Sequence, residues 1–206
     1  APLPSTDTEI GKATSYIEMD YYLSSTGNEL ISNSVNPRLR HAFFSVGKWT
    51  FGQTWSTFMF LPGLNEQLDF GGYAGTNFVR QSMIKYTTSF GAWTLDAALE
   101  NAETSATTGA DSTIEDPITE DKEAINVASD NDAMPDIIAR LTHKADYGTI
   151  AFGAMLRKHN SEELGKDDSA IALTAGGKIN YMGKSNFKFN VAHGNLGRYG
   201  SFTAFK

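Results

Sequence analysis

Residues 93–100 read Trp-Thr-Leu-Asp-Ala-Ala-Leu-Glu, so large apolar side chains alternate with polar or small ones. In a β-strand successive side chains point to opposite faces. The alternation therefore puts Trp93, Leu95 and Leu99 on one face, with Asp96 and Glu100 on the other. The same period of two recurs at 12–23, 149–157 and 187–192. A helical period would not sustain it, and the sequence predicts an all-β protein.

The alternating stretches predict nine strands. Most are about 9–13 residues long, whereas strands of globular proteins usually have about 5–6 residues. A tilted strand that crosses a bilayer needs about 9–11 residues. The nine strands are expected at 12–23, 37–46, 49–60, 77–88, 92–100, 135–145, 149–158, 169–181 and 186–195.

The connections between these strands alternate in length. Tight turns are expected at 47–48, 89–91, 146–147 and 183–185. Much longer loops are expected at 24–36, 61–76, 101–134 and 159–168. Short turns at one end and long loops at the other are typical of outer-membrane barrels. The sequence thus predicts one domain over residues 1–206, an antiparallel transmembrane β-barrel.

Charge and composition exclude several classes of protein. The chain has no cysteine, so it has no disulfide and no thiolate metal site. Between Glu103 and Asp132 nine acidic residues stand against Lys122 alone, a net charge of −8, which leaves +1 for the rest of a chain with a total of −7. No basic stripe exists to bind phosphates, so nucleic acid is not an expected partner.

The charges also predict which face of each strand meets lipid. A lysine or arginine on the lipid face near mid-bilayer costs about 2–4 kcal/mol. We therefore expect an aqueous lumen beside Glu18, Asp20, Asp96, Glu100, Arg157 and Lys188. The face expected to meet lipid carries Trp93, Leu95, Ala97, Leu99, Phe187, Phe189 and Val191. Trp49, Trp93 and Tyr147 lie at tight turns and indicate an interfacial girdle, with ordinary core packing as the alternative.

Four blocks of sequence resemble the DcaP-like porin family in both content and spacing. They are PRLRHAFF at 37–44, WTFGQTWSTF at 49–58, LDFGG at 68–72 and FVRQ at 78–81. Weaker similarity runs from about Gly11 to Tyr199, through MPDI at 134–137 and GRY at 197–199. The resemblance implies a sixteen-stranded homotrimeric porin in the outer membrane of a Gram-negative bacterium. It also implies an arginine-rich constriction that passes small anionic solutes such as dicarboxylates.

The chain departs from that family in its number of strands. The family has further strands before and after this stretch, and some members carry an N-terminal periplasmic coiled coil. Nine antiparallel strands cannot close on themselves in the usual way. The start, Ala1 to Pro4, shows no signal peptide. We therefore expect a partial barrel: an internal fragment, a truncated product or an incompletely determined sequence.

Arginines are the candidate pore-lining residues. Arg38 and Arg40 lie two apart on one strand, so both guanidinium groups point to the same face, where Arg80, Arg140 and Arg157 could join them. A ring of such groups favours anions. The alternative is that these arginines pair with carboxylates on neighbouring strands and hold the wall. The glycine-rich 61–76 loop could fold into the lumen, where its Asp69 could orient an arginine; a plain surface loop is the alternative.

Signals for an enzyme, a cofactor or a metal are weak. The four histidines form no HExxH motif, and no serine lies in a GxSxG motif. The acidic segment lacks the spacing of a calcium loop, although it could bind divalent cations that bridge lipopolysaccharide; a solvated loop is the alternative. We predict a porin that is not an enzyme and has no cofactor. Two alternatives remain: an adhesive or structural barrel with a closed lumen and partner-binding loops, and a soluble β-sandwich or lipocalin-like binder.

Overall fold

Twelve strands and two short 3-10 helices make up the part of the chain that the computed structural model describes. That part comprises residues 5–21, 37–64, 66, 77–102, 104–107, 126–129, 134–161, 166–183 and 185–200. The strands are β1 (Ser5–Thr8), β2 (Gly11–Asp20), β3 (Arg38–Val46), β4 (Trp49–Trp55), β5 (Arg80–Phe90), β6 (Trp93–Glu100), β7 (Thr104–Thr107), β8 (Asn126–Ser129), β9 (Asp136–Ala145), β10 (Gly148–Ser161), β11 (Lys166–Asn180) and β12 (Asn186–Gly194). The 3-10 helices are η1 (Leu61–Gly63) and η2 (Gly197–Gly200).

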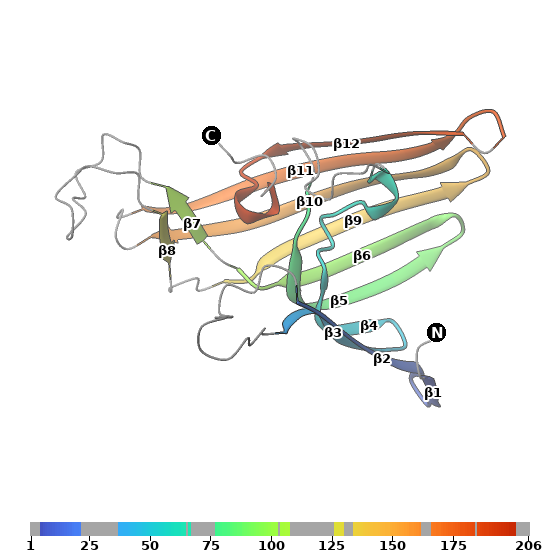
Figure 1. Ribbon diagram of the computed structural model, residues 1–206, viewed down its shortest axis with the longest axis horizontal. Helices are drawn as coiled ribbons and strands as arrows, with labels where there is room; N and C mark the ends of the chain where they lie inside the picture. Colours follow the sequence, from blue (N-terminus) through green and yellow to red (C-terminus); the bar gives the residue numbers. More distant parts are fainter. Residues whose placement is uncertain are drawn as a thin grey trace, which may run out of the picture.

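Ten of the strands form one antiparallel meander (Figure 1). Their order is β1-β2-β3-β4-β5-β6-β9-β10-β11-β12, so consecutive strands of this sheet are neighbours and no connection crosses over. All nine expected strands are present, and β1 adds a tenth that the sequence did not reveal. The sheet is open, because β1 and β12 are its two edges in the described part of the chain. We call the end with the tight turns the turn end, and the opposite end the loop end.

Several expected boundaries were wrong. The strand predicted at 49–60 ends at Trp55, where the chain leaves the sheet. The loop predicted at 159–168 is largely strand, because β10 runs to Ser161 and β11 begins at Lys166. The loop predicted at 101–134 holds the separate β7–β8 hairpin. Residues 22–36, which include the loop predicted at 24–36, lie outside the described residues.

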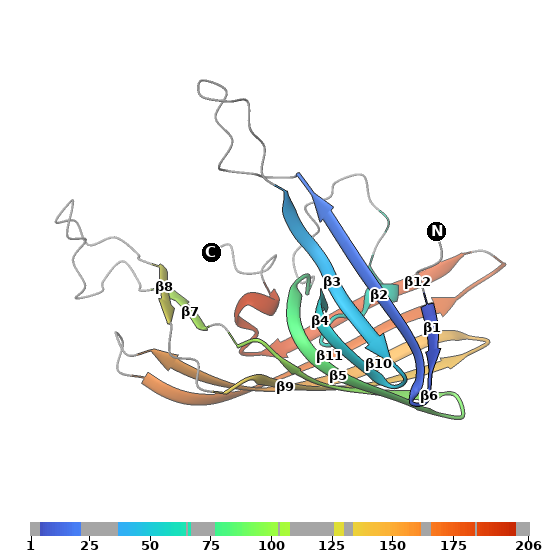
Figure 2. The same ribbon diagram turned by 90° about the horizontal axis from the view of Figure 1, so that it is seen from below.

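The sheet curves into an open trough with two unlike faces (Figure 2). Leu99, Phe187 and Val191 are 45–62% exposed on the convex face, whereas Ala98 and Glu100, the neighbours of Leu99, are buried on the concave face. Ala97 is exposed as well. Trp93, Leu95 and Phe189 are partly covered by neighbours on their own face: Trp93 packs 4.4 Å from the His143 ring, for example. The predicted outward face is therefore confirmed.

Residues 56–64, which we call the inner segment, lie on the concave face together with η2 (Figure 2). Ser56 to Phe60 are all buried. Phe58 packs edge-on against the Tyr199 ring, 5.9 Å between ring centres. Phe60 occupies the space that a side chain at Gly176 of β11 would need. A residue without Cβ at position 176 thus lets the inner segment approach the wall.

Aromatic side chains gather near the turn end. The Trp49 ring lies 5.0 Å from the Tyr86 ring, and Trp49 is 45% exposed. Tyr147 stacks on His143, whose Nδ1 is 2.5 Å from the Tyr147 hydroxyl. Rings that combine an apolar body with a polar edge suit a membrane interface. Among the described residues, no helix is long and apolar enough to span a membrane.

A new charge should cost different amounts of stability at two neighbouring positions of β9 that lie on opposite faces. Leu141 faces outward between Leu95 and Phe152, whereas Thr142 faces inward. Leu141→Lys should destabilise the protein in lipid vesicles by about 2–4 kcal/mol, and Thr142→Lys by under about 1 kcal/mol, because its ammonium group stays in water. Equilibrium urea unfolding in vesicles measures both. Equal losses, or a larger loss for Thr142→Lys, would contradict the assignment of faces.

Candidate functional site

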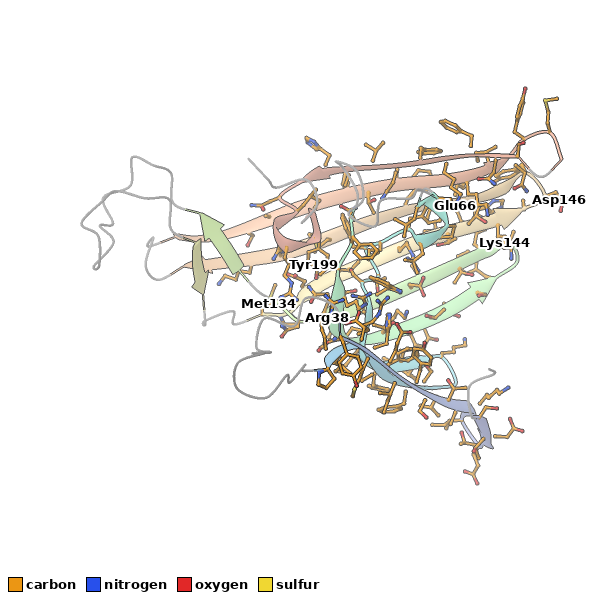
Figure 3. The ribbon with its side chains drawn as sticks, in the orientation of Figure 1. Arg38, Glu66, Met134, Lys144, Asp146 and Tyr199 are labelled. Atoms are coloured by element: carbon orange, nitrogen blue, oxygen red, sulfur yellow. The ribbon has the colours of Figure 1, made fainter. Side chains whose placement is uncertain are left out.

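Arg38 and Arg40 meet a pair of carboxylates on the adjacent strand. Arg38 donates to both oxygens of Asp20, at 2.9 and 2.7 Å. Arg40 donates to Asp20 at 3.0 Å and lies 2.6 Å from Glu18. The two arginines therefore point to one face, as the sequence predicted, and both are paired with acids. Figure 3 shows Arg38 among the side chains near the loop end of β3.

A β-bulge explains how Arg40 reaches its partners. Glu18 faces His41 and Met19 faces Leu39, so Arg40 is an extra residue without a register partner. An extra residue of this kind kinks a strand and re-aims its side chain. Arg40 and His41 consequently lie on the concave face although they are neighbours in sequence. Alternation alone would have put His41 on the lipid side.

Arg80 lies beside Arg40 and His41, in a different environment from that of Arg38 and Arg40. Its guanidinium carbon is 3.9 Å from the centre of the Trp55 ring, the position opposite it on β4. Its Nε donates to Nε2 of His41 at 3.4 Å, and Nδ1 of His41 is 3.1 Å from the Thr54 hydroxyl. Among the described residues, Arg80 forms no salt bridge. Among the described residues, the three arginines Arg38, Arg40 and Arg80 thus face two carboxylates, Glu18 and Asp20.

Arg140 and Arg157 are engaged in holding the structure together. Arg140 pairs with Asp96 at 2.7 Å and donates to the Met59 carbonyl of the inner segment. Arg157 pairs with Asp136 at 3.2 Å, where the two side chains are only 2% and 1% exposed. These contacts fit the alternative reading, in which the arginines pair across neighbouring strands. They also show that Arg140 ties the wall to the inner segment.

Glu100 and Tyr199 form the second anchor of the inner segment. The Thr57 backbone N–H donates to Glu100 at 2.6 Å, and the Tyr199 hydroxyl donates to the other oxygen of the same carboxylate at 3.3 Å. A buried carboxylate needs such donors. Around them Phe58, Ile138, Met155, Ala172 and Tyr199 form the hydrophobic core on the concave face.

A third contact joins the end of η1 to the far side of the sheet. Lys188 of β12 donates to the Leu64 carbonyl at 3.0 Å and to Glu66 at 3.1 Å. The hydrogen bond from Lys188 holds the pKa of the Glu66 carboxyl below its ordinary value. The start of the 61–76 loop therefore folds inward and reaches β12. Asp69 lies outside the described residues.

Three residues that shape this region had no role predicted from the sequence: Trp55 and His41, which surround Arg80, and Tyr199, which fastens the inner segment. Glu100, the other residue that fastens it, was expected only to face the lumen. The signal for Trp55, His41 and Tyr199 was their position inside the blocks WTFGQTWSTF and PRLRHAFF and the short motif GRY. Within the described part of the chain, no group of three or more acidic or histidine side chains is placed to hold a metal ion.

An antiparallel meander of long strands, apolar on its convex face and charged on its concave face, belongs to the transmembrane β-barrel class of folds. Among solved structures, the chain is similar to the outer membrane channel DcaP of Acinetobacter baumannii, with a TM-score of 0.71 and 18% sequence identity. The match covers 95% of this chain and 52% of that one, so the chain spans about half the length of the channel. The likeness confirms the expected fold. No family profile and no curated protein sequence matches the chain.

The buried pair of Arg157 with Asp136 and the partly exposed pairs of Asp20 should contribute differently to the free energy of unfolding. Asp136→Ala should lower the free energy of unfolding by about 3–5 kcal/mol, because it removes a carboxylate that pairs with the buried Arg157 guanidinium group. Asp20→Ala should cost about 1 kcal/mol, because water reaches Arg38 and Arg40. The double variant Asp136→Leu/Arg157→Met should recover much of the loss. Urea unfolding of detergent-solubilised protein measures all three, and an Asp20→Ala loss as large as that of Asp136→Ala would contradict this ranking.

Proposed function

We propose that this chain forms wall strands of a porin in the outer membrane of a Gram-negative bacterium, which lets small, preferably anionic solutes such as dicarboxylates diffuse passively. The observation that carries the proposal is the environment of Arg80. This arginine has a permanent charge and no acidic partner among the described residues, next to two arginines that are neutralised. A guanidinium group with open donors can take a carboxylate in a bidentate grip.

The surroundings of Arg80 support this role. The Trp55 ring, 3.9 Å from the guanidinium carbon, attracts the charge of Arg80 without satisfying its hydrogen-bond donors. His41 supplies one acceptor and no negative charge while its ring is neutral. Low-dielectric walls around a lumen would concentrate the field of the Arg80 charge on a passing solute. Arg38 and Arg40 act mainly by tying β2 to β3 and by adding to the same field.

The two edge strands of the sheet need partners in a membrane. In hydrocarbon an unpaired backbone N–H or C=O group costs several kcal/mol, so sheets that span membranes are closed. In the proposed channel the edges β1 and β12 therefore pair with further strands. Assembly as a homotrimer within a membrane that contains lipopolysaccharide belongs to the same proposal and rests on the family resemblance alone.

One observation favours the alternative of a structural or adhesive barrel with a closed lumen. The inner segment and η2 bury Phe58 and Tyr199 against the concave face, and this packing occupies space that a pore would use. Planar-bilayer recording separates the two functions. An open porin gives stepwise conductance on insertion, whereas a closed barrel inserts without steps.

The charge balance around Arg80 predicts a set of selectivity changes. Under a salt gradient, the reversal potential of the wild type should indicate anion preference. Arg80→Ala should reduce that preference most, and Arg80→Lys should keep most of it, because it retains the charge. Arg38→Ala should have a smaller effect, since Arg38 is already paired with Asp20. Asp20→Asn should increase anion preference, because it removes one of the two neutralising acids.

Two results would reject the assignment. The first is cation preference in the wild type. The second is a set of variants in which Arg80→Ala leaves the reversal potential unchanged while Asp20→Asn shifts it toward cations. Circular dichroism of each variant in detergent verifies that the β-structure is intact before recording.

A further inference from the structure

A second cationic site lies toward the turn end of the concave face, away from the arginine cluster. Lys178 of β11 and Lys188 of β12 are register partners, directly opposite each other. Lys178 shares its face with Gly176, which accommodates Phe60 of the inner segment. Figure 3 shows Glu66, the residue that contacts Lys188, on the side toward the Asp146 turn, well separated from Arg38.

The two lysines are only partly neutralised. Like charges directly opposite each other weaken a sheet, so this pair needs compensation. Lys188 has it: its side chain is 13% exposed and donates to the Leu64 carbonyl and to Glu66. Lys178 has no hydrogen bond or salt bridge with any described residue. Among the described residues, one carboxylate thus serves two ammonium groups.

The ion pair with Lys188 holds the Glu66 carboxylate only weakly. Its side chain is 92% exposed, and an ion pair with so exposed a partner contributes little. Both lysines attract the carboxylate, since the field of Lys178 adds to the hydrogen bond of Lys188 in lowering the pKa of Glu66. Glu66 therefore marks a position beside Lys188 where an oxyanion is held within the field of Lys178. It is also a group that an incoming anion can displace or join.

We propose that Lys178 and Lys188 form a second binding site for small oxyanions, carboxylate or phosphate groups, on the turn side of the inner segment. The site deepens the proposed function: an anion that passes the arginine cluster would meet a second site before it leaves the lumen. Conduction requires sites that attract an ion and release it, and several weak sites achieve this better than one strong site. Lysine suits such a site, because it offers a flexible point charge rather than a rigid bidentate grip.

The test measures binding independently of conduction. Full-length protein in a zwitterionic detergent is dialysed against radiolabelled inorganic phosphate at low ionic strength, and the binding constant is determined for each variant. Lys178→Gln should weaken phosphate binding by about tenfold, the effect of losing one charged donor. Glu66→Gln should strengthen binding severalfold, because it removes the competing carboxylate. Lys144→Gln is the matched control: it removes the same charge at the same end of the sheet, where Thr149 and not a lysine lies opposite.

The outcomes separate this site from the proposed pore. Equal affinities in Lys178→Gln and Lys144→Gln, or no saturable phosphate binding by the wild type, would overturn the site even if the channel conducts anions. Binding that falls in Lys178→Gln and rises in Glu66→Gln supports the site even if bilayer recording shows no conductance. When the dialysis is repeated at about 0.15 M ionic strength, Arg80→Ala should leave phosphate affinity at the lysine pair within about twofold, since charges more than about 8–10 Å apart are then screened by salt.

Discussion

A strand that crosses hydrocarbon must pair every backbone group and keep its charged side chains on the face away from lipid. The ten-stranded meander meets the first requirement along nine strand pairs and leaves only β1 and β12 as edges in the described chain. Strict alternation meets the second requirement. Leu99 and Val191 lie on the convex face, while Asp96 and Glu100 are buried on the concave one. Fold and charge distribution are two consequences of the same requirement.

The functional features lie where the chain departs from regular alternation. The bulge at Arg40 gathers Arg40 and His41 on one face beside Arg80. At Ser56 the chain leaves β4 and crosses the concave face, where Arg140, Glu100 and Lys188 fasten it at three separate points. In these contacts the three charged side chains are hydrogen-bonded to the backbone of the inner segment. Within these two clusters, Arg80 and Lys178 are the cations that form no salt bridge with a described residue.

Alternation and turn spacing were enough to predict the antiparallel meander, nine strands and the outward face of β6 and β12. The same signal could not reveal β1, whose four residues are too short for a period to register. It also extended β4 to residue 60, because the apolar residues of the inner segment continue the pattern of the strand. The pairing of Arg157 with Asp136, and the anchoring of Thr57 by Glu100, join residues far apart in sequence. No local pattern encodes such pairs.

In the proposed barrel the convex face meets lipid and the concave face meets water. Because the chain has no native cysteine, single cysteines can be introduced at 94–99 of β6 and spin-labelled in lipid vesicles. Power-saturation electron paramagnetic resonance then reports collisions with oxygen, which concentrates in lipid, and with a water-soluble nickel chelate. We expect oxygen access to peak at 95, 97 and 99 and to fall at 94, 96 and 98. Access without a period of two, or with the peaks at 94, 96 and 98, would contradict this assignment of the two faces.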